Sequence, residues 1–403
     1  MRVLFDEPEG IAIAAGFSKG VSGMRPVDLA WLGDHRSRHT GADGGGWWYK
    51  AKSGIADIGL CASRRSQVIP IEDFRSHLPM WKMPPRAHAS LVLTVEPAAG
   101  EDGPTWAAWL ATQEHAQWFP HEVFDPSADL LAPLDDGWPR RLLADKKVLV
   151  IGLGSIGSAA CQALASYGIR HFTLVDPGRL LARNFARHRA LRTEHGRLKV
   201  RAVADLLTQR DGLVEVMPLS LDADQNADLL RALVRDADIV LVCSDGTRSR
   251  RVSAHLAFRA GKPVVLACVQ GAGAYGEVLR LIPGRTGCLV CNRDALKHAL
   301  EPEPLGFDLD YDLPGETGHP MTAVTGDLGL VADLAAKATV ATLLQALGDR
   351  SQKLAGEMCL IALRPQPDFP EPFNTLTEAG QVLWTATAAA REECPTCGTL
   401  NRS

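Results

Sequence analysis

The chain has 403 residues, of which 46% are hydrophobic and 22% charged, with a formal net charge of −4 and an isoelectric point near 6.3. This length can bury one large core and is more typical of two domains. The nearly balanced charge gives no electrostatic argument for nucleic acid as a partner, and no apolar run is long enough to cross a membrane. The first ten residues carry acids where a secretory signal needs an apolar run. We therefore expect the nine cysteines to be thiols or metal ligands in a reducing cytoplasm.

Residues 1–140 differ in composition from the rest and are predicted to form a small α+β accessory domain whose role the sequence does not assign. Eight of the nine tryptophans lie here, and we expect them in a core rather than on a binding surface. The pattern predicts a strand at Ser90–Val95, a turn at Ala99–Gly103 and a helix at Trp106–His115. The segment Pro126–Pro139 is interpreted as a linker to the next domain.

Two features of this N-terminal third have a chemical interpretation, and for both the plainer one is preferred. His35 and His39 are four residues apart, but their glycine-rich surroundings indicate a solvated loop rather than one face of a helix. Cys61 is the only cysteine of the region and a candidate nucleophile or thioester acceptor. Because no histidine or aspartate partner can be named for it, we expect an inert buried thiol.

The segment 147–176 predicts a nucleotide site. It contains a β-branched strand, a glycine turn, a helix and a second strand, with Gly152, Gly154 and Gly157 at the spacing GxGxxG. A glycine turn that leads into a helix gathers backbone N–H groups at the positive end of the helix dipole, which suits a phosphate. Asp176 ends the second strand, where a carboxylate can accept hydrogen bonds from ribose hydroxyls. The glycines alone indicate only a nucleotide, and NAD is their default ligand.

The polar residues that follow favour phosphate and metal chemistry. Asn184, Arg187 and Lys199 lie between the second strand and the next helix, where they can converge on phosphates over the glycine turn. The alternative is a solvated basic face. Asp245 follows a strand at its carboxyl end, where a carboxylate can hold Mg²⁺ against nucleotide phosphates. Asp245 can equally cap the next helix through the N–H of Thr247.

The remaining pattern of this domain alternates strands and helices. Strands are predicted at 214–217, 239–242 and 264–267, with helices at 223–234 and 249–259. Such alternation is typical of an α/β fold in which a parallel sheet is covered on both faces.

Four cysteines form two matched pairs that predict a zinc site. Cys288 and Cys291 make one CxxC motif, Cys394 and Cys397 the other, and 102 residues separate them. Two such motifs supply four thiolates, which suits a closed tetrahedral Zn²⁺ site with a structural role. Two redox-active pairs are the alternative. A zinc site would fix the C-terminal tail to the strand region after Gly276.

The run from Lys147 to about Leu347 resembles the adenylation domain of the ThiF/MoeB and ubiquitin-activating enzyme superfamily. The resemblance lies in the segments VLVIGLGSIGS, LVD, NFAR, GRLKV and VLVCSDGTRSR, in that order, and in the paired CxxC motifs. It implies that residues 141–403 form a Rossmann-like adenylation domain with a mixed, mainly parallel sheet. The site residues that it implies are Gly152, Gly154 and Gly157 for ATP, Asp176 for the ribose, Asn184, Arg187 and Lys199 for the phosphates, and Asp245 for Mg²⁺.

The chain departs from the family pattern at three places. Residues 292–320, here called the crossover segment, correspond to a loop under which a substrate C-terminus passes, and they lack the reactive cysteine that many relatives place there. Gly178 stands where a second acid usually follows the ribose aspartate. Arg140 and Arg141 are candidates for the arginine finger that a neighbouring subunit contributes, with a solvated pair as the alternative.

The resemblance implies adenylation of the C-terminal carboxylate of a ubiquitin-like or sulfur-carrier protein by a cytoplasmic homodimer, with release of pyrophosphate. The alternatives are adenylation of a peptide or tRNA-linked carboxylate, an NAD-dependent oxidoreductase, and a non-catalytic scaffold. The thiols of Cys161, Cys243, Cys268 and Cys359 lie in segments that are expected to be buried, where little thiolate forms. We therefore predict that the adenylate passes to a separate acceptor, a conjugating enzyme or a sulfur donor.

Overall fold

The chain divides into two compact units, Met1–Ala128 and Asp129–Ser403. The computed structural model describes residues 2–6, 23–32, 42–48, 68–77, 89–96, 105–119, 121–124, 129, 131–295 and 323–398. The predicted features at His35, His39 and Cys61, and most of the crossover segment, lie outside these residues.

The first unit contains two four-stranded sheets and a short helix, α3 (Ile71–His77). The strand orders are β3-β2-β1-β8 and β4-β7-β6-β5. The strands are β1 (Arg2–Asp6), β2 (Gly23–Leu32), β3 (Ala42–Trp48), β4 (Val68–Pro70), β5 (Ala89–Glu96), β6 (Thr105–Thr112), β7 (His115–Phe119) and β8 (His121–Phe124).

The helix predicted at Trp106–His115 is wrong, whereas the strand predicted at Ser90–Val95 is confirmed as β5. Residues of the expected helix form β6 and the start of β7, and β6 pairs antiparallel with β5. The alanines of this segment favour a helix by intrinsic propensity. Burial follows a period of two instead, because Ala107, Trp109 and Ala111 are all at most 3% exposed. Trp109 packs on Phe74 of α3, with ring centroids 5.3 Å apart.

The second unit is built on an eight-stranded sheet of order β11-β10-β9-β12-β13-β14-β15-β16. The first five strands in this order are parallel, and the last three pair antiparallel. This confirms the predicted α/β class with a mixed sheet. The strands are β9 (Lys147–Ile151), β10 (His171–Val175), β11 (Glu215–Leu219), β12 (Ile239–Val242), β13 (Val264–Gln270), β14 (Tyr275–Leu281), β15 (Met358–Ala362) and β16 (Val382–Thr385).

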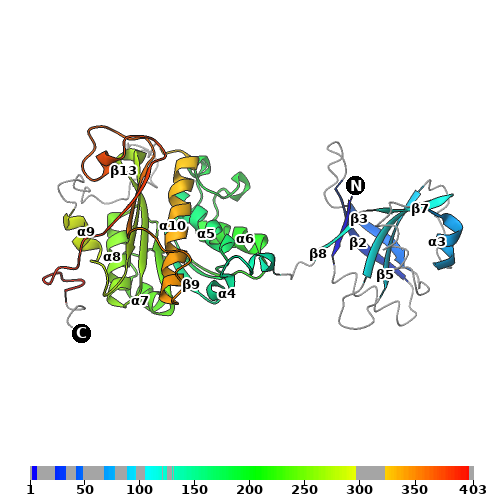
Figure 1. The fold of residues 1–403 in the computed structure, drawn as a ribbon, viewed down its shortest axis with the longest axis horizontal. Helices are drawn as coiled ribbons and strands as arrows, with labels where there is room; N and C mark the ends of the chain where they lie inside the picture. The colour runs from blue at the N-terminus through cyan, green and yellow to red at the C-terminus, as the bar shows by residue number, and fades with distance from the viewer. Residues whose placement is uncertain are drawn as a thin grey trace. The chain divides into compact units, whose positions relative to one another are not determined.

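Helices cover both faces of this sheet, which explains why its central strands are apolar on both sides (Figure 1). In β9, Val148 and Val150 join the core beneath α5, α6 and α10, whereas Leu149 and Ile151 join the core beneath α7 and α8. The helices of this unit are α4 (Arg140–Leu143), α5 (Ser155–Ser166), α6 (Lys199–Arg210), α7 (Ala227–Asp236), α8 (Thr247–Arg259), α9 (Leu289–Ala295) and α10 (Thr325–Ala346).

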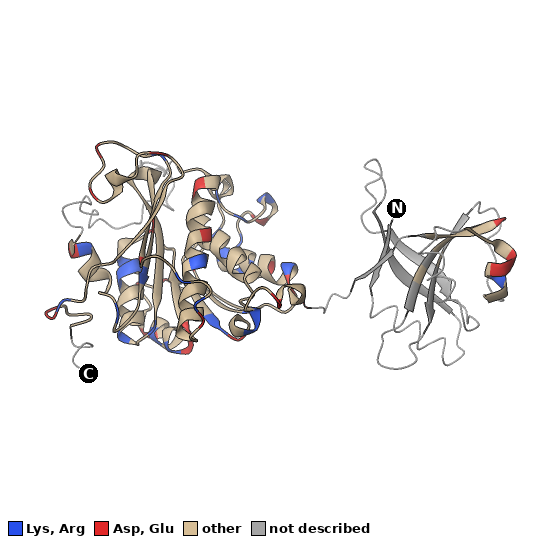
Figure 2. Ribbon diagram, viewed as in Figure 1, with Lys and Arg blue, Asp and Glu red and all other residues tan. Residues whose placement is uncertain are grey.

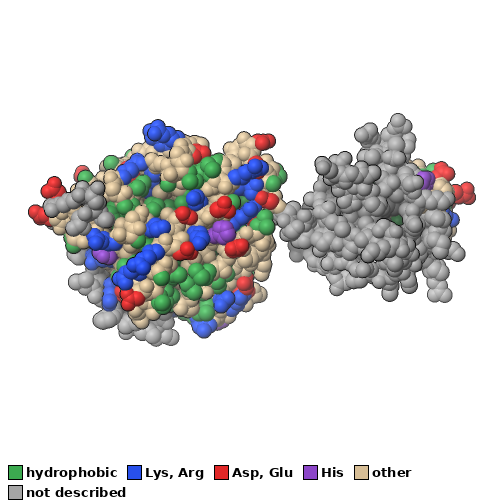
Figure 3. Space-filling view, turned by 90° about the horizontal axis from the view of Figure 1, so that it is seen from below, with side chains coloured by type: hydrophobic (Ala, Val, Ile, Leu, Met, Phe, Trp, Pro, Cys, Tyr) green, Lys and Arg blue, Asp and Glu red, His purple; other side chains and the backbone are tan. Residues whose placement is uncertain are grey.

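The surface of the second unit mixes both signs of charge. Basic and acidic residues both lie on its helices (Figure 2), and their side chains are intermixed on the face that Figure 3 shows. Within the described ranges, no helix combines the length and the hydropathy that crossing a bilayer requires.

Candidate functional site

Two glycines allow the turn after β9 to pack against the end of β12. Gly152 has φ +88°, and a Cβ atom there would lie 2.5 Å from the backbone nitrogen of Ser244. A Cβ atom on Gly157 would lie 1.9 Å from the carbonyl oxygen of Gly152. Both positions therefore require glycine, one for its conformation and both for close approach of the backbone.

Gly154 differs from the other two motif glycines, Gly152 and Gly157, because the space beside it is open. It is the N-cap of α5, and no atom lies within 4 Å of the position that its Cβ would take. Helix α5 is 12 residues long, so its first backbone N–H groups and its dipole favour an anion at this end. The arrangement fits a nucleotide phosphate in contact with the Gly154 backbone.

Asp176 holds the glycine turn in place. It is 7% exposed, and its two carboxylate oxygens accept hydrogen bonds from the backbone N–H groups of Leu153 and Gly178, each at 2.7 Å. Each carboxylate oxygen has two lone pairs, so both retain capacity for the ribose hydroxyls that the sequence assigns to this residue.

His188 also holds the turn, and the sequence analysis missed it. It is 7% exposed, its Nε2–H donates to the carbonyl oxygen of Leu153 at 2.7 Å, and its Nδ1 accepts from the backbone N–H of Ala190 at 2.9 Å. This pairing requires the neutral ring, because Nδ1 must be unprotonated to accept. Burial lowers the pKa of His188, and the nearby Lys199 lowers it further. The only signal in the sequence is its place directly after Arg187.

Lys199 lies close to Asp176. It is the first residue of α6, its side chain is 15% exposed, and its Nζ is 3.9 Å from Oδ1 of Asp176. A Cβ atom on Gly178 would lie 2.9 Å from this Nζ. The lack of a side chain at position 178 therefore leaves room for the lysine ammonium group.

The loop that carries Asn184 and Arg187 is fixed from two sides. Asn184 lies in a short 3₁₀ helix (Ala182–Ala186), and its Oδ1 accepts from the backbone N–H of Leu181 at 2.8 Å. Thr325, the first residue of α10, donates from Oγ1 to the carbonyl oxygen of Ala186 at 2.7 Å. The half-buried Arg187 follows directly.

Asp245 is surrounded by protein and still reached by solvent. Burial raises the pKa of its carboxyl group, and the nearby cations of Arg250 and Lys199 oppose that shift. Arg187 also opposes it, so these charges act on one another at the carboxyl ends of the parallel strands. The residue as a whole is exposed, and it directly precedes Gly246, the N-cap of α8. A solvent-accessible carboxylate among cations that suit phosphates has the donor chemistry for Mg²⁺.

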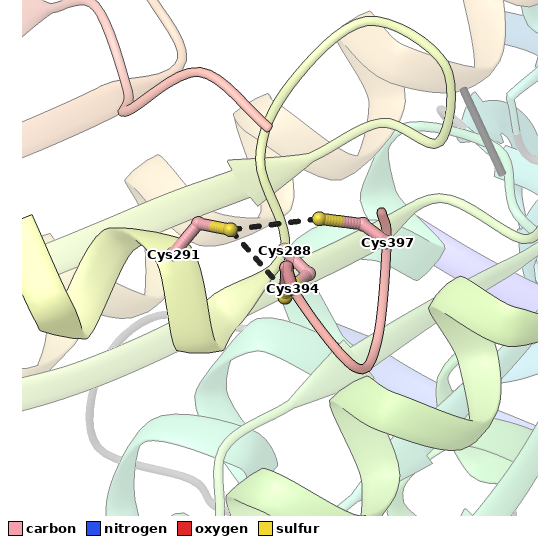
Figure 4. A group of neighbouring side chains, drawn as sticks. All are labelled: Cys288, Cys291, Cys394 and Cys397. Atoms are coloured by element: carbon pink, nitrogen blue, oxygen red, sulfur yellow. Dashed lines mark hydrogen bonds between the residues drawn. The ribbon is translucent and has the colours of Figure 1, made fainter. Parts of the chain in front are cut away.

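The four cysteines of the CxxC pairs converge on one point (Figure 4). Their sulfur atoms all lie within 4.8 Å of one another, and every one of the four residues is buried. The Sγ atoms of Cys288 and Cys394 are 3.4 Å apart, and those of Cys291 and Cys397 are 3.5 Å apart. A tetrahedral zinc–thiolate site places its sulfurs roughly 3.8 Å apart, so the set fits Zn²⁺.

Backbone groups complete this cysteine site. Although burial acts in the opposite direction, the N–H groups of Cys397 and Thr396 lower the pKa of Cys394 to about 6. Asn292 of α9 accepts from the N–H of Ala388 at 2.9 Å. A Cβ atom on Gly398 would lie 2.1 Å from the carbonyl oxygen of Glu392, so the second motif closes tightly. The C-terminal segment is thereby bound to the start of α9.

Comparison with known protein families identifies the family of this chain. The sequence profile of the ThiF family matches residues 133–374, which is more than half of the chain. The chain belongs to the ThiF family.

Individual relatives match this chain over part of its length. An uncharacterised protein y4oA of Sinorhizobium fredii is 32% identical over 37% of this chain and 28% of its own length. The sulfur carrier protein ThiS adenylyltransferase of Bacillus subtilis is 25% identical over 67% of this chain and 70% of its own length. The molybdopterin-synthase adenylyltransferase of Escherichia coli is 34% identical over 30% of this chain and 49% of its own length. A solved structure of Escherichia coli MccB is 20% identical, with a TM-score of 0.48 over 64% of this chain and 68% of that chain.

Arg140 of this ThiF-family chain is neither a solvated residue nor available as a finger. It is 6% exposed, and its guanidinium pairs with Asp135 through two hydrogen bonds of 2.6 and 2.9 Å and also pairs with Asp129. Arg141 has a side chain that is 83% exposed and lies 2.9 Å from Asp135. Arg140 differs from the exposed Arg141 because its ion pairs with Asp129 and Asp135 hold the start of the ThiF unit together.

Four thiols of the ThiF unit lie in the core, as the sequence predicts. Cys161, Cys243, Cys268 and Cys359 are each at most 7% exposed. Burial raises the pKa of all four, to about 12 for Cys268 and Cys359. None of these four is a ready nucleophile at neutral pH.

Proposed function

We propose that residues 141–403 catalyse ATP-dependent adenylation of the C-terminal carboxylate of a small ubiquitin-like or sulfur-carrier protein, with residues 1–140 as an accessory domain. The observation that carries the proposal is the open space beside the Gly154 backbone, with Asp176 bonded to the same turn and the Nζ of Lys199 3.9 Å from Asp176. Membership of the ThiF family and the printed names of the Bacillus and Escherichia relatives support it.

The reaction needs no nucleophilic side chain. An oxygen of the substrate carboxylate attacks the α-phosphorus of ATP, the bond to the bridging oxygen breaks, and pyrophosphate leaves with the bonding electrons. Lys199 and Arg187 would neutralise phosphate charge, and the N–H groups at the start of α5 would orient the phosphate chain. Bound at Asp245, Mg²⁺ supplies further charge neutralisation on the phosphates.

The cationic side chains favour adenylation over hydride transfer. A dehydrogenase has no use for a lysine, an arginine and an accessible carboxylate arranged around the phosphate end of its cofactor. Zn²⁺ at the four cysteines would be structural, because four thiolates leave no open position. We place the enzyme in the cytoplasm as a homodimer that hands its adenylate to a conjugating enzyme or a sulfur donor.

Pyrophosphate exchange tests the proposal. Labelled pyrophosphate should enter ATP only when a carrier protein ending in Gly-Gly is present, the first choice being one encoded beside the gene. Asp245→Asn should slow the exchange at least about 100-fold without unfolding the protein. Asp236→Asn is the matched control, because Asp236 pairs with Lys147 and both side chains are more than half exposed.

Each of four outcomes would contradict one part of this proposal. Exchange at the wild-type rate in Asp245→Asn would reduce that residue to a helix cap. Tighter binding of NAD than of ATP–Mg in calorimetry would favour an oxidoreductase. Exchange that depends on a short peptide or an aminoacyl-tRNA, and not on a carrier, would replace the substrate class. ATP binding without exchange for any carboxylate would indicate a non-catalytic scaffold.

A further inference from the structure

The backbone of Leu153 is held on both sides by side chains from distant segments, one on the peptide before it and one on the peptide after it. The N–H of Leu153 donates to Asp176, and its carbonyl oxygen accepts from Nε2 of His188, both at 2.7 Å. In a trans peptide, the carbonyl of one residue and the N–H of the next point in opposite directions. The bond from His188 therefore sets the direction of the Gly154 N–H.

Such an anchor is needed because the turn has little stiffness of its own. Glycines precede and follow Leu153, and glycine visits conformations that other residues rarely adopt. Without an external bond, the peptide between Leu153 and Gly154 can rotate and turn its carbonyl toward the position of a phosphate. An oxygen there repels the anion that an N–H attracts.

We propose that His188 is a positioning residue of the nucleotide site, which keeps the Gly154 N–H directed at the phosphates of ATP. This inference rests on the proposed function, since it takes ATP as the ligand of the turn. His188 also connects the turn to the loop of Arg187, so one ring orients a backbone donor and a cation for the same phosphates.

The neutral ring is the form that can do this. A proton on Nδ1 would face the N–H of Ala190, which is itself a donor, and the two groups would repel. Lys199 from α6 and Asp176 after β10 are the charged groups that act on the ring. Burial keeps the pKa of His188 below its usual value, so the ring stays neutral at physiological pH.

Two variants separate the hydrogen bonds from the imidazole. His188→Gln retains both a donor and an acceptor at the end of a side chain of similar reach, and it does not titrate. His188→Leu removes both. His171→Gln is the control, because His171 begins β10 and pairs with Glu215 at 3.2 Å. Calorimetry with ATP–Mg and with adenosine, at pH 7.5 and pH 5.5, measures the effect.

We expect His188→Leu to weaken ATP binding about 10- to 100-fold at pH 7.5. Adenosine, which has no phosphates, should bind within about twofold of wild type. His188→Gln should bind ATP within about threefold of wild type. As the pH falls from 7.5 to 5.5, the wild type should lose more affinity for ATP than His188→Gln, because only histidine can gain a proton. The nucleotide's own phosphates titrate equally in both proteins, so their effect cancels in the ratio of the two affinities.

The opposite results are equally clear. Wild-type ATP affinity in His188→Leu, or an equal loss for ATP and adenosine, would overturn the positioning role. A His188→Gln variant as weak as His188→Leu would assign the effect to the imidazole itself. If the wild type binds no ATP, the proposed function fails, and hydrogen exchange decides the remaining question. The amides of 152–158 should then exchange faster in His188→Leu than in wild type and in His188→Gln, and equal rates would refute the anchor.

Discussion

The ammonium nitrogen of Lys199 lies 3.9 Å from Oδ1 of Asp176, and the glycine at position 178 makes this approach possible. A methyl group on Gly178 would lie 2.9 Å from the lysine nitrogen and 3.0 Å from the carboxylate oxygen. The two charged groups thus share the space that a second acid would need. The glycine therefore permits close contact between the lysine that we propose for the phosphates and the aspartate that we propose for the ribose.

Gly178→Ala should weaken ATP binding with little effect on the fold. The methyl group would displace the flexible end of Lys199, while the backbone, which is not in the left-handed region, tolerates alanine. We expect roughly a tenfold loss of ATP affinity by calorimetry and a change in Tm of less than about 3 °C. Gly137→Ala is the control, because nothing lies within 4 Å of its Cβ position. Unchanged ATP affinity in Gly178→Ala would mean that Lys199 does not contact the nucleotide.

Two of the three motif glycines, Gly154 and Gly157, should separate binding from folding. Gly154→Ala meets no atom within 4 Å, so the protein should fold with nearly unchanged Tm, but the methyl group should occupy the space of a phosphate and lower ATP affinity at least about tenfold. Gly157→Ala would place its Cβ 1.9 Å from Gly152, which should destabilise the fold by about 1–3 kcal/mol. Thermal unfolding with and without ATP–Mg distinguishes the two, and equal loss of stability in both would contradict the open site.

One Zn²⁺ per chain should be found by metal analysis of protein purified under reducing conditions without chelators. Cys394→Ser should release the metal and the C-terminal segment, and lower stability by at least about 2 kcal/mol, or roughly 4–8 °C in Tm for a unit of this size. ATP affinity should stay within about twofold, since the residues assigned to the nucleotide are separate from the thiolates. Metal-free protein with the wild-type Tm would reject the zinc assignment.

The four core thiols should resist alkylation in the folded protein. Cys161, Cys243, Cys268 and Cys359 are buried and their pKa values are raised, so iodoacetamide at pH 8 should leave them unmodified until the protein is denatured. Incubation with ATP–Mg and a carrier should likewise give no reductant-sensitive adduct on a non-reducing gel. A stoichiometric adduct that one Cys→Ala change removes would show that the enzyme itself accepts the acyl group.

The sheet of the second unit could be predicted from sequence wherever local pattern decides structure. The buried runs of β9 and β12 are continuous and rich in β-branched residues, so these strands follow from composition. Helix α10 is absent from the predicted elements, because its alanine-rich sequence shows no narrow apolar face and its burial extends around much of the helix. In β6, only pairing with β5 reveals that Ala107, Trp109 and Ala111 share the buried face of a strand.

The site shows the same division between local motifs and tertiary contacts. Gly152, Gly154, Gly157 and the paired cysteines are short motifs, and their spacing predicts a nucleotide turn and a cluster of four thiols. His188 bonds Leu153, which is 35 residues away, and nothing in the sequence around either residue indicates that contact. Arg140 forms ion pairs with Asp129 and Asp135, and these pairs depend on how the chain folds back on itself.

The bond from Thr325 to Ala186 joins the first turn of α10 to the loop of Arg187, the arginine that we propose to contact the phosphates. Thr325 follows the crossover segment in the chain, and Ala186 directly precedes Arg187. A macromolecule that engages the crossover segment and shifts this turn must therefore alter the free energy of nucleotide binding. Thermodynamic reciprocity then requires the nucleotide to alter the affinity for that macromolecule by the same factor. A single hydroxyl group can in this way make the binding of two substrates cooperative.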